Sequence, residues 1–106
     1  MIIYKLPDLS SSPQRRVSYV INNKQLSFVF WWLGNSCLLS VYTIRDGQKV
    51  YLLQNISIAP NVDLFARINN YNIITGSLYI KNKNDVDTEI TQDNFHTDFE
   101  MEYYDE

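Results

Sequence analysis

The sequence predicts an all-β protein, a small antiparallel β-barrel or sandwich with at most one short helical turn. Apolar residues recur at every second position along much of the chain, which is the periodicity of a half-buried strand. No window sustains the i, i+3, i+4, i+7 stripe of a helix. Aromatic residues make up 14% of the chain, and these types favour strands. Short strands with turn signals between them, at intervals of about 8 to 12 residues, favour a barrel or a sandwich.

The length of 106 residues predicts a single domain over residues 1–106. Residues 1–12 are expected to form an N-terminal arm or an edge strand. The end of this segment, residues 9–13, is the expected connection to the first long strand. That strand, residues 14–21, places Val17, Tyr19 and Ile21 on one face.

Two hairpins are predicted next along the chain. Asn22 and Asn23 tolerate the positive φ of a tight turn, so residues 14–21 pair with residues 26–32. Alternation turns four side chains of the second strand toward the core: Leu26, Phe28, Phe30 and Trp32. After a break at residues 34–36, a strand over residues 38–43 precedes the Asp46-Gly47 turn signal.

The second half of the chain carries weaker signals. Residues 49–58 are expected as one broken strand or two short ones, with a bend at Asn55, before a turn at residues 59–61. Residues 62–67 are the helical candidate. The remaining expectations are a polar corner at residues 69–72, a strand at 77–81, an exposed loop or hairpin tip at 81–91 and an alternating last strand at 95–104.

The sequence offers little for catalysis, and we expect neither an enzyme nor a cofactor or metal site. His96 lies in phase with acidic residues on the expected solvent face of the last strand, and Cys37 has no candidate base nearby in the sequence. The acidic residues Asp85, Asp87 and Glu89 do not match the spacing of a calcium loop. With three glycines and no Gly-Lys-Ser/Thr, the chain has no phosphate-binding loop.

Charge and hydrophobicity limit the classes of partner and the cellular location that are expected. The formal net charge is −3, which disfavours a mainly electrostatic nucleic-acid binder. The lone cysteine suits a reducing compartment. We see no signal-peptide run and no stretch of about 20 apolar residues, so a soluble protein that does not contact membranes is expected.

Surface residues are the remaining candidates for function. Alternation leaves Trp31 on the face opposite Trp32, where it is either an exposed contact residue or covered by another layer. The acidic segment, residues 98–106, is read first as a solubilising face and second as a docking site for a basic partner. The interface candidates are large apolar or aromatic side chains on strands and on the arm: Trp31, Tyr42, Tyr51, Tyr104, Ile2 and Tyr4.

The order of these signals resembles the baseplate plug family of small phage tail proteins, from contractile-tailed cyanophage-like particles. The resemblance starts at Pro13 and Gln14, continues through the alternating strand, the Asn turn and the aromatic strand ending in Trp32, and closes with residues 94–103. Residues 55–65 stand in place of a Gly-Val-Pro-Leu-Val-Pro-Gly-Val-Asp-Leu-Leu segment, with Asn55 and Asn61 where the family has Gly. The chain departs from the family pattern at the start of the third strand, where Cys37 or Leu38 replaces a second Trp that the family tends to carry.

The resemblance implies a structural virion protein at the distal end of the tail, with hub, tube or spike proteins as partners. Assembly in the cytoplasm of the host bacterium would then be expected, and self-association stays open. The alternative from the residues is an OB-like module for single-stranded nucleic acid, because such barrels display aromatic side chains for base stacking. The basic residues argue against it, since they are scattered over separate turns and loops.

Overall fold

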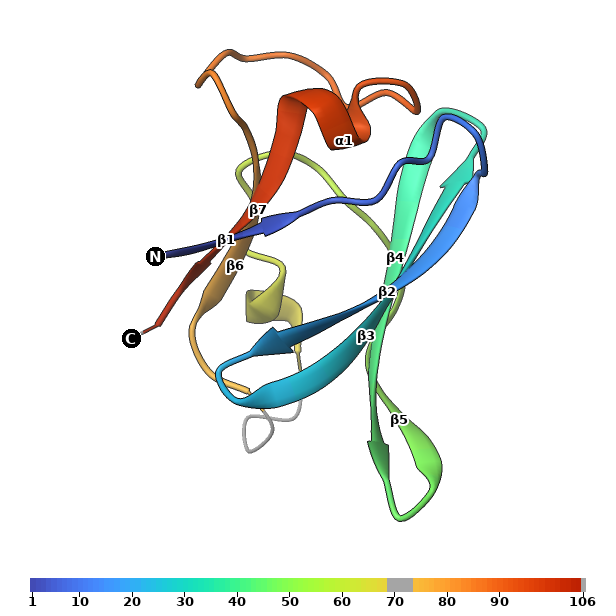
Figure 1. Cartoon of the computed structure of the whole chain (residues 1–106), viewed down its shortest axis with the longest axis vertical. Coiled ribbons are helices and arrows are strands. Elements are labelled where there is room, and N and C mark those ends of the chain that lie inside the picture. Colours follow the sequence, from blue (N-terminus) through green and yellow to red (C-terminus); the bar gives the residue numbers. More distant parts are fainter. Residues whose placement is uncertain (69–73, 106) are drawn as a thin grey trace.

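The computed structural model describes residues 1–68 and 74–105, whose strands form two antiparallel sheets around a shared core (Figure 1). The larger sheet has the order β2-β3-β4-β5, with β2 at Gln14–Ile21, β3 at Lys24–Leu33, β4 at Ser36–Arg45 and β5 at Gln48–Ser57. The smaller sheet has the order β1-β7-β6, with β1 at Ile2–Lys5, β7 at Phe99–Tyr104 and β6 at Ser77–Asn82. No backbone ladder joins the two sheets in the described part of the chain. The all-β prediction is therefore confirmed, as paired sheets rather than a closed barrel.

Residues with positive φ form the tight turns of the larger sheet. Asn22 and Asn23 have φ values of 50° and 62°, and Asp46 and Gly47 have 52° and 76°. Two successive residues with positive φ match the twist of the strands that a two-residue hairpin connects. Gly34, with φ 65°, lies between β3 and β4. The predicted hairpins are confirmed.

A bulge interrupts the pairing of β4 with β5. The register shifts between Leu39 and Tyr42, and Asn55 opposite this region has φ 48°. Ser40 fixes the irregularity, because its hydroxyl accepts a hydrogen bond from the Asn55 N–H at 2.9 Å. The predicted broken strand is thus one continuous element with a bend at Asn55, as a bulge requires.

Alternate residues of both sheets fill the core. The larger sheet contributes Phe28, Phe30 and Leu39, each 0% exposed, and the smaller sheet contributes Ile80 and Met101, also 0% exposed. The four predicted inward residues of β3 lie on this side, Trp32 only partly buried. Alternation therefore sets which face of each strand is buried.

The connection after β5 protects the outer edge of β6. The turn at residues 59–61 is confirmed by Asn61, which has φ 64°. The Asn61 and Leu64 N–H groups then donate to backbone oxygens of β6, and the Asp63 carboxylate accepts from the Leu78 N–H at 3.0 Å. The expected helical turn follows as the 3-10 helix η1 at Phe65–Arg67. The polar corner predicted at residues 69–72 lies outside the described residues.

The prediction for the last strand was wrong over its first four residues. A helical turn, α1 at Phe95–Asp98, precedes β7. The Asn94 side chain closes the preceding turn through bonds with Thr91 and Glu89, and the Asp98 N–H donates to the Asn94 carbonyl at 2.9 Å. Phe95 and Phe99 share a face in a helix as they do in a strand, so the pattern did not separate the two. The exposure of Thr97 shows the difference, because a strand would have buried it.

The N-terminal segment contacts both sheets: β1 forms an edge of the smaller sheet, and Tyr4 bonds to Val20 of the larger sheet. β1 pairs only with β7 in the described structure, with Ile2 opposite Tyr103. Leu6 and Leu9 then enter the core at 6% and 0% exposure. The expected exposed loop between β6 and α1 runs along the outside of the molecule (Figure 1).

Candidate functional site

The outer face of the larger sheet, the side turned away from the core, carries exposed apolar side chains. Trp31 is 38% exposed and Leu33 is 52% exposed. Leu38 is half-buried and lies opposite Trp31 in the β3–β4 register. We define the outer face by eight residues that alternate with core positions: Arg16, Val29, Trp31, Leu33, Leu38, Tyr42, Lys49 and Tyr51. Among the described residues, Trp31 is partly exposed, which fits the first of its two interpretations, an exposed residue.

Tyr42 lies beneath the surface of this face. It is 3% exposed, its ring centre is 5.4 Å from that of Tyr51, and Lys49 Nζ is 4.7 Å from the ring. Arg16 Nη1 donates to the Tyr42 hydroxyl at 3.3 Å. The expectation that Tyr42 offers contact area therefore does not fit the isolated chain, because its neighbours cover it. Tyr51, 44% exposed, does offer area.

The edge strand β1 combines exposed and anchored residues. Ile2 and Ile3 are each 52% exposed. Tyr4 is instead tied to the larger sheet: its hydroxyl donates to the Val20 carbonyl at 2.8 Å, and its ring packs edge-on against Tyr19. Tyr4 thus positions the strand, while Ile2 remains accessible.

Tyr104 makes its contacts within the smaller sheet. Its hydroxyl donates to Glu102 Oε1 at 2.7 Å, and its ring packs edge-on against Tyr79. Lys81 lies over both rings and 3.8 Å from Glu102. The hydrogen bond with the Glu102 carboxylate raises the pKa of Tyr104. Tyr104 is half-buried and offers less contact area than the exposed Trp31 and Tyr51.

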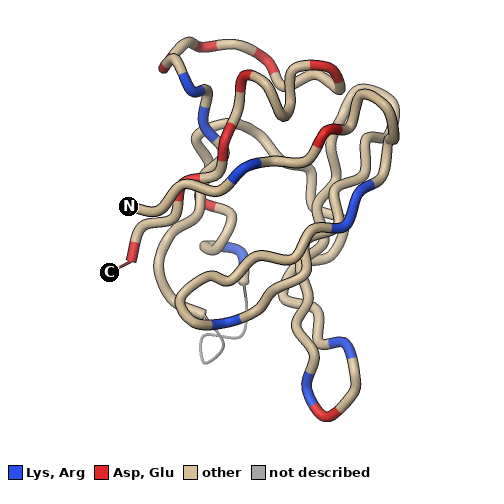
Figure 2. Tube along the Cα trace, viewed as in Figure 1, with Lys and Arg blue, Asp and Glu red and all other residues tan. Residues whose placement is uncertain are grey.

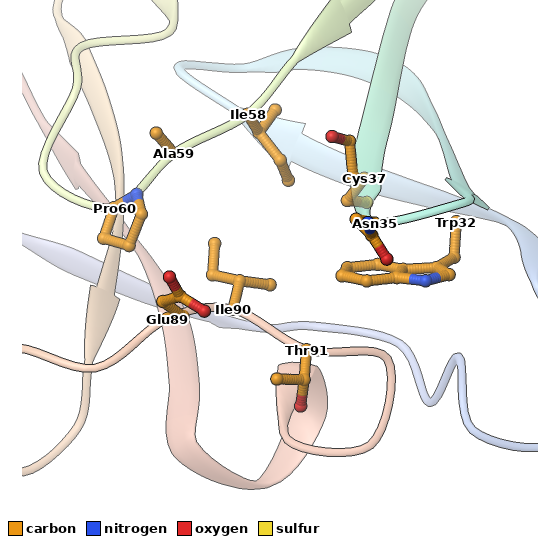
Figure 3. A pocket seen from close by; sticks show the side chains of 10 residues that line it. Trp32, Asn35, Cys37, Ile58, Ala59, Pro60, Glu89, Ile90 and Thr91 are labelled. Atoms are coloured by element: carbon orange, nitrogen blue, oxygen red, sulfur yellow. The ribbon is translucent and has the colours of Figure 1, made fainter.

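A cleft of about 550 Å³ opens beside the β3–β4 hairpin (Figure 3). Trp32 and Cys37 line one side, and Ile90 with its neighbours Glu89 and Thr91 lines another. Cys37 is 2% exposed, and burial raises the pKa of its thiol to about 12. A thiol with that pKa stays protonated near neutral pH, so it is a poor nucleophile.

We expect Cys37 to resist thiol reagents in the folded protein. Because the thiol is buried and protonated, a colorimetric disulfide reagent at pH 8 should label it only after the chain is unfolded in guanidinium chloride. The absorbance of the released thiolate measures the labelling. Rapid stoichiometric labelling of the folded protein would contradict this placement of Cys37.

Ser10, Asp8 and His96 lie together but not in the order of a catalytic triad. Asp8 Oδ1 accepts from the Ser10 hydroxyl at 2.5 Å and lies 3.4 Å from His96 Nδ1. The carboxylate therefore stands between hydroxyl and imidazole, whereas activation of a serine requires the imidazole in the middle. Over residues 1–68 and 74–105, no group of three His, Cys, Asp or Glu residues could hold a metal ion. In the same ranges, no helix is long and apolar enough to cross a membrane.

Sequence reasoning missed several members of the outer face. Leu33, Leu38, Arg16 and Lys49 were not singled out, although alternation along β2 to β5 could have placed them beside Trp31. Arg16 and Lys49 both contact Tyr42 only because β2, β4 and β5 are aligned in one sheet. That alignment depends on strand register, which no single strand reveals.

The exposed features of this small all-β protein are an apolar sheet face and an edge strand. Both features are typical of proteins that act by binding other proteins. Its family is identified by comparison: the family model of the cyanophage baseplate Pam3 plug gp18 matches residues 3–106. The chain belongs to this family of phage baseplate plug proteins, and its role is that of a structural component of the tail baseplate. No curated protein matches the chain. The nucleic-acid-binding alternative gains no support.

Proposed function

We propose that the chain, as one β domain, fills its plug role by binding hub, tube or spike proteins of the baseplate through the outer face. Assembly takes place in the cytoplasm of the host bacterium, and the protein performs no reaction. The observation that carries this proposal is the exposed apolar strip of Trp31, Leu33 and Leu38, together with Tyr51. Burial of aromatic anchors of this kind supplies much of the binding energy in protein interfaces.

The edge strand β1 is a second point of contact in this proposal. It pairs with β7 on one side, and Ile2 and Ile3 are exposed. An extended segment of a partner can add to an open strand edge through backbone hydrogen bonds. The edge of β6 is less suited to this, because residues 61–64 already bond to it.

The absence of enzymatic activity is supported by the chemistry of the polar groups. The buried Cys37 thiol has a raised pKa, and the Ser10, Asp8 and His96 side chains stand in the wrong order for nucleophile activation. The cleft beside Cys37 has one ionisable side chain besides the thiol, Glu89. The lining of this cleft therefore gives Glu89 no second ionisable partner other than the buried thiol.

The test is the mass of the purified chain in solution by light scattering, alone and mixed with each baseplate protein encoded beside it. The proposal predicts co-elution with at least one of them at the summed mass. The measurement on the chain alone gives its own oligomeric state. A chain that elutes unchanged in every mixture would refute the proposal.

Trp31→Ala is expected to weaken that complex by about 2 kcal/mol or more, which is the loss typical of an aromatic anchor. The isolated chain should keep most of its stability, because Trp31 belongs to the outer face and not to the core. Titration calorimetry measures the affinity, and urea unfolding measures the stability. Val86→Ala is the matched control, since Val86 is 54% exposed in the loop before α1. Equal affinity of the two variants would remove Trp31 from the interface.

A further inference from the structure

Two cations share one tyrosine on the outer face. Arg16 comes from β2 and donates to the Tyr42 hydroxyl at 3.3 Å, and Lys49 comes from β5 and lies 4.7 Å from the Tyr42 ring. Both side chains are exposed, while Tyr42 is buried beneath them. Tyr51 adds an exposed aromatic ring beside this group. The three strands thus hold two positive charges next to one tyrosine, with Lys49 over its ring and Arg16 at its hydroxyl.

No carboxylate of the described structure neutralises these cations. Its lysine–carboxylate ion pair is Lys81 with Glu102, and the contact of His96 with Asp8 likewise involves neither Arg16 nor Lys49. The hydrogen bond from Arg16, one from Ser27 and the charge of Lys49 lower the pKa of Tyr42. These groups therefore favour a negative charge on the Tyr42 hydroxyl.

Charge is also divided between the two parts of the chain. Residues 14–57, which include the whole larger sheet, hold five basic residues and one acidic residue, a net charge of +4. The other residues hold four basic and eleven acidic residues, a net charge of −7. In Figure 2 most acidic positions lie on β7 and on the segment between β6 and β7. The turn between β4 and β5 holds Asp46, the single acidic residue of residues 14–57. The charge of the outer face thus has the sign opposite to that of the whole chain.

We propose that the outer face binds a baseplate protein whose surface presents carboxylate side chains around an apolar group. One or two carboxylates accept hydrogen bonds from Arg16 and Lys49, and the apolar group packs against Trp31 and Leu38. Charge complementarity supplies orientation and speed of association, while the apolar contact supplies most of the affinity. This inference rests on the proposed function and adds the chemistry of the partner. A nucleic acid fits less well, because a backbone of phosphates needs a longer row of cations.

The test is a double charge reversal, Arg16→Glu with Lys49→Glu, compared with Arg67→Glu and Lys83→Glu. The control pair changes the net charge equally, its side chains are exposed, and neither residue is one of the eight that define the outer face. Titration calorimetry against the co-eluting baseplate protein should show affinity lost on the order of tenfold or more for the first pair. The control pair should stay close to the original affinity. Urea unfolding and a second variant, Arg16→Gln with Lys49→Gln, separate lost charge from lost folding.

Salt provides a readout that an apolar contact alone would not give. The dissociation constant of the unaltered complex should rise between about 0.05 and 0.5 M NaCl, and the Gln variant should lose much of that dependence. Equal affinity for both reversal pairs would overturn the inference and leave the proposed function intact. The absence of any complex with the unaltered chain would overturn both. Salt-sensitive binding of a dT oligonucleotide, or self-association that the Arg16/Lys49 reversal abolishes, would assign the cations to a different occupant and also overturn the inference.

Discussion

Phe95→Ala is expected to lower the free energy of unfolding by about 3 to 5 kcal/mol. Phe95 is 0% exposed, and its ring centre lies 5.3 Å from that of Phe30, which brings α1 against β3 of the larger sheet. Truncation leaves a cavity at this contact between the C-terminal segment and the larger sheet. Stabilities of small domains are about 5 to 15 kcal/mol, so the loss is a large part of the total. Urea unfolding followed by tryptophan fluorescence measures it.

Val86→Ala serves as the control for this prediction as well. Val86 is 54% exposed, and its truncation should change the stability by no more than about 0.5 kcal/mol. If Phe95→Ala were as mild as this control, Phe95 would not lie in the core, and the packing of α1 against β3 would be wrong.

Gly76→Ala is expected to cost about 2 to 4 kcal/mol, from a strained backbone and from steric overlap. Gly76 has φ 93°, a conformation that side chains disfavour. An added Cβ would stand 2.5 Å from the Tyr104 carbonyl oxygen and 2.7 Å from the Tyr103 hydroxyl. The Tyr103 hydroxyl donates to the Thr75 carbonyl at 2.7 Å, so it is not free to withdraw without breaking that bond.

Gly34→Ala separates the two causes. Gly34 also has positive φ, at 65°, but nothing lies within 4 Å of the position of its Cβ. This variant should lose only about 1 to 2 kcal/mol, the cost of the backbone conformation. Thermal unfolding by circular dichroism compares the two variants directly. A Gly76→Ala protein as stable as Gly34→Ala would show that the close approach to β7 is absent.

Most of the fold follows from local rules that a sequence carries by itself. Alternation located β2, β3, β4 and β6, and the Asn22-Asn23 and Asp46-Gly47 pairs located their hairpins. These predictions succeeded because strand periodicity and turn chemistry act over a few residues. The exception at residues 95–98 arose where the spacing of two phenylalanines suits a helix and a strand equally.

The candidate site is harder to predict, because it depends on contacts between distant parts of the chain. Alternation put Trp31 on the face opposite Trp32 and left open whether another layer covers it; its 38% exposure depends on the whole fold. Tyr42, another contact candidate, is 3% exposed, because Arg16, 26 residues earlier, and Lys49 contact it. The pairing of β1 with β7 likewise joins the two ends of the described chain, and no local pattern sets it.

Membership in the plug family and the exposed apolar side chains of the outer face are both consistent with a protein that acts by binding other proteins. A baseplate is an assembly of many proteins, so a chain of 106 residues contributes through the area it buries and the geometry it imposes. A two-sheet core gives the rigid support, and the outer face and β1 give the contacts in our proposal. Residues 14–57 and the rest of the chain carry net charges of opposite sign, and this asymmetry would orient the chain among its neighbours.

The most direct test of this account is an electron cryo-microscopy reconstruction of the intact tail that carries this chain. The account predicts density for the two-sheet module within the baseplate, with Trp31 buried against a neighbouring protein and an acidic residue of that neighbour near Arg16 or Lys49. A baseplate in which the module is present but the outer face is open to solvent would contradict the proposed contacts. A complete tail without the chain would contradict the structural role itself.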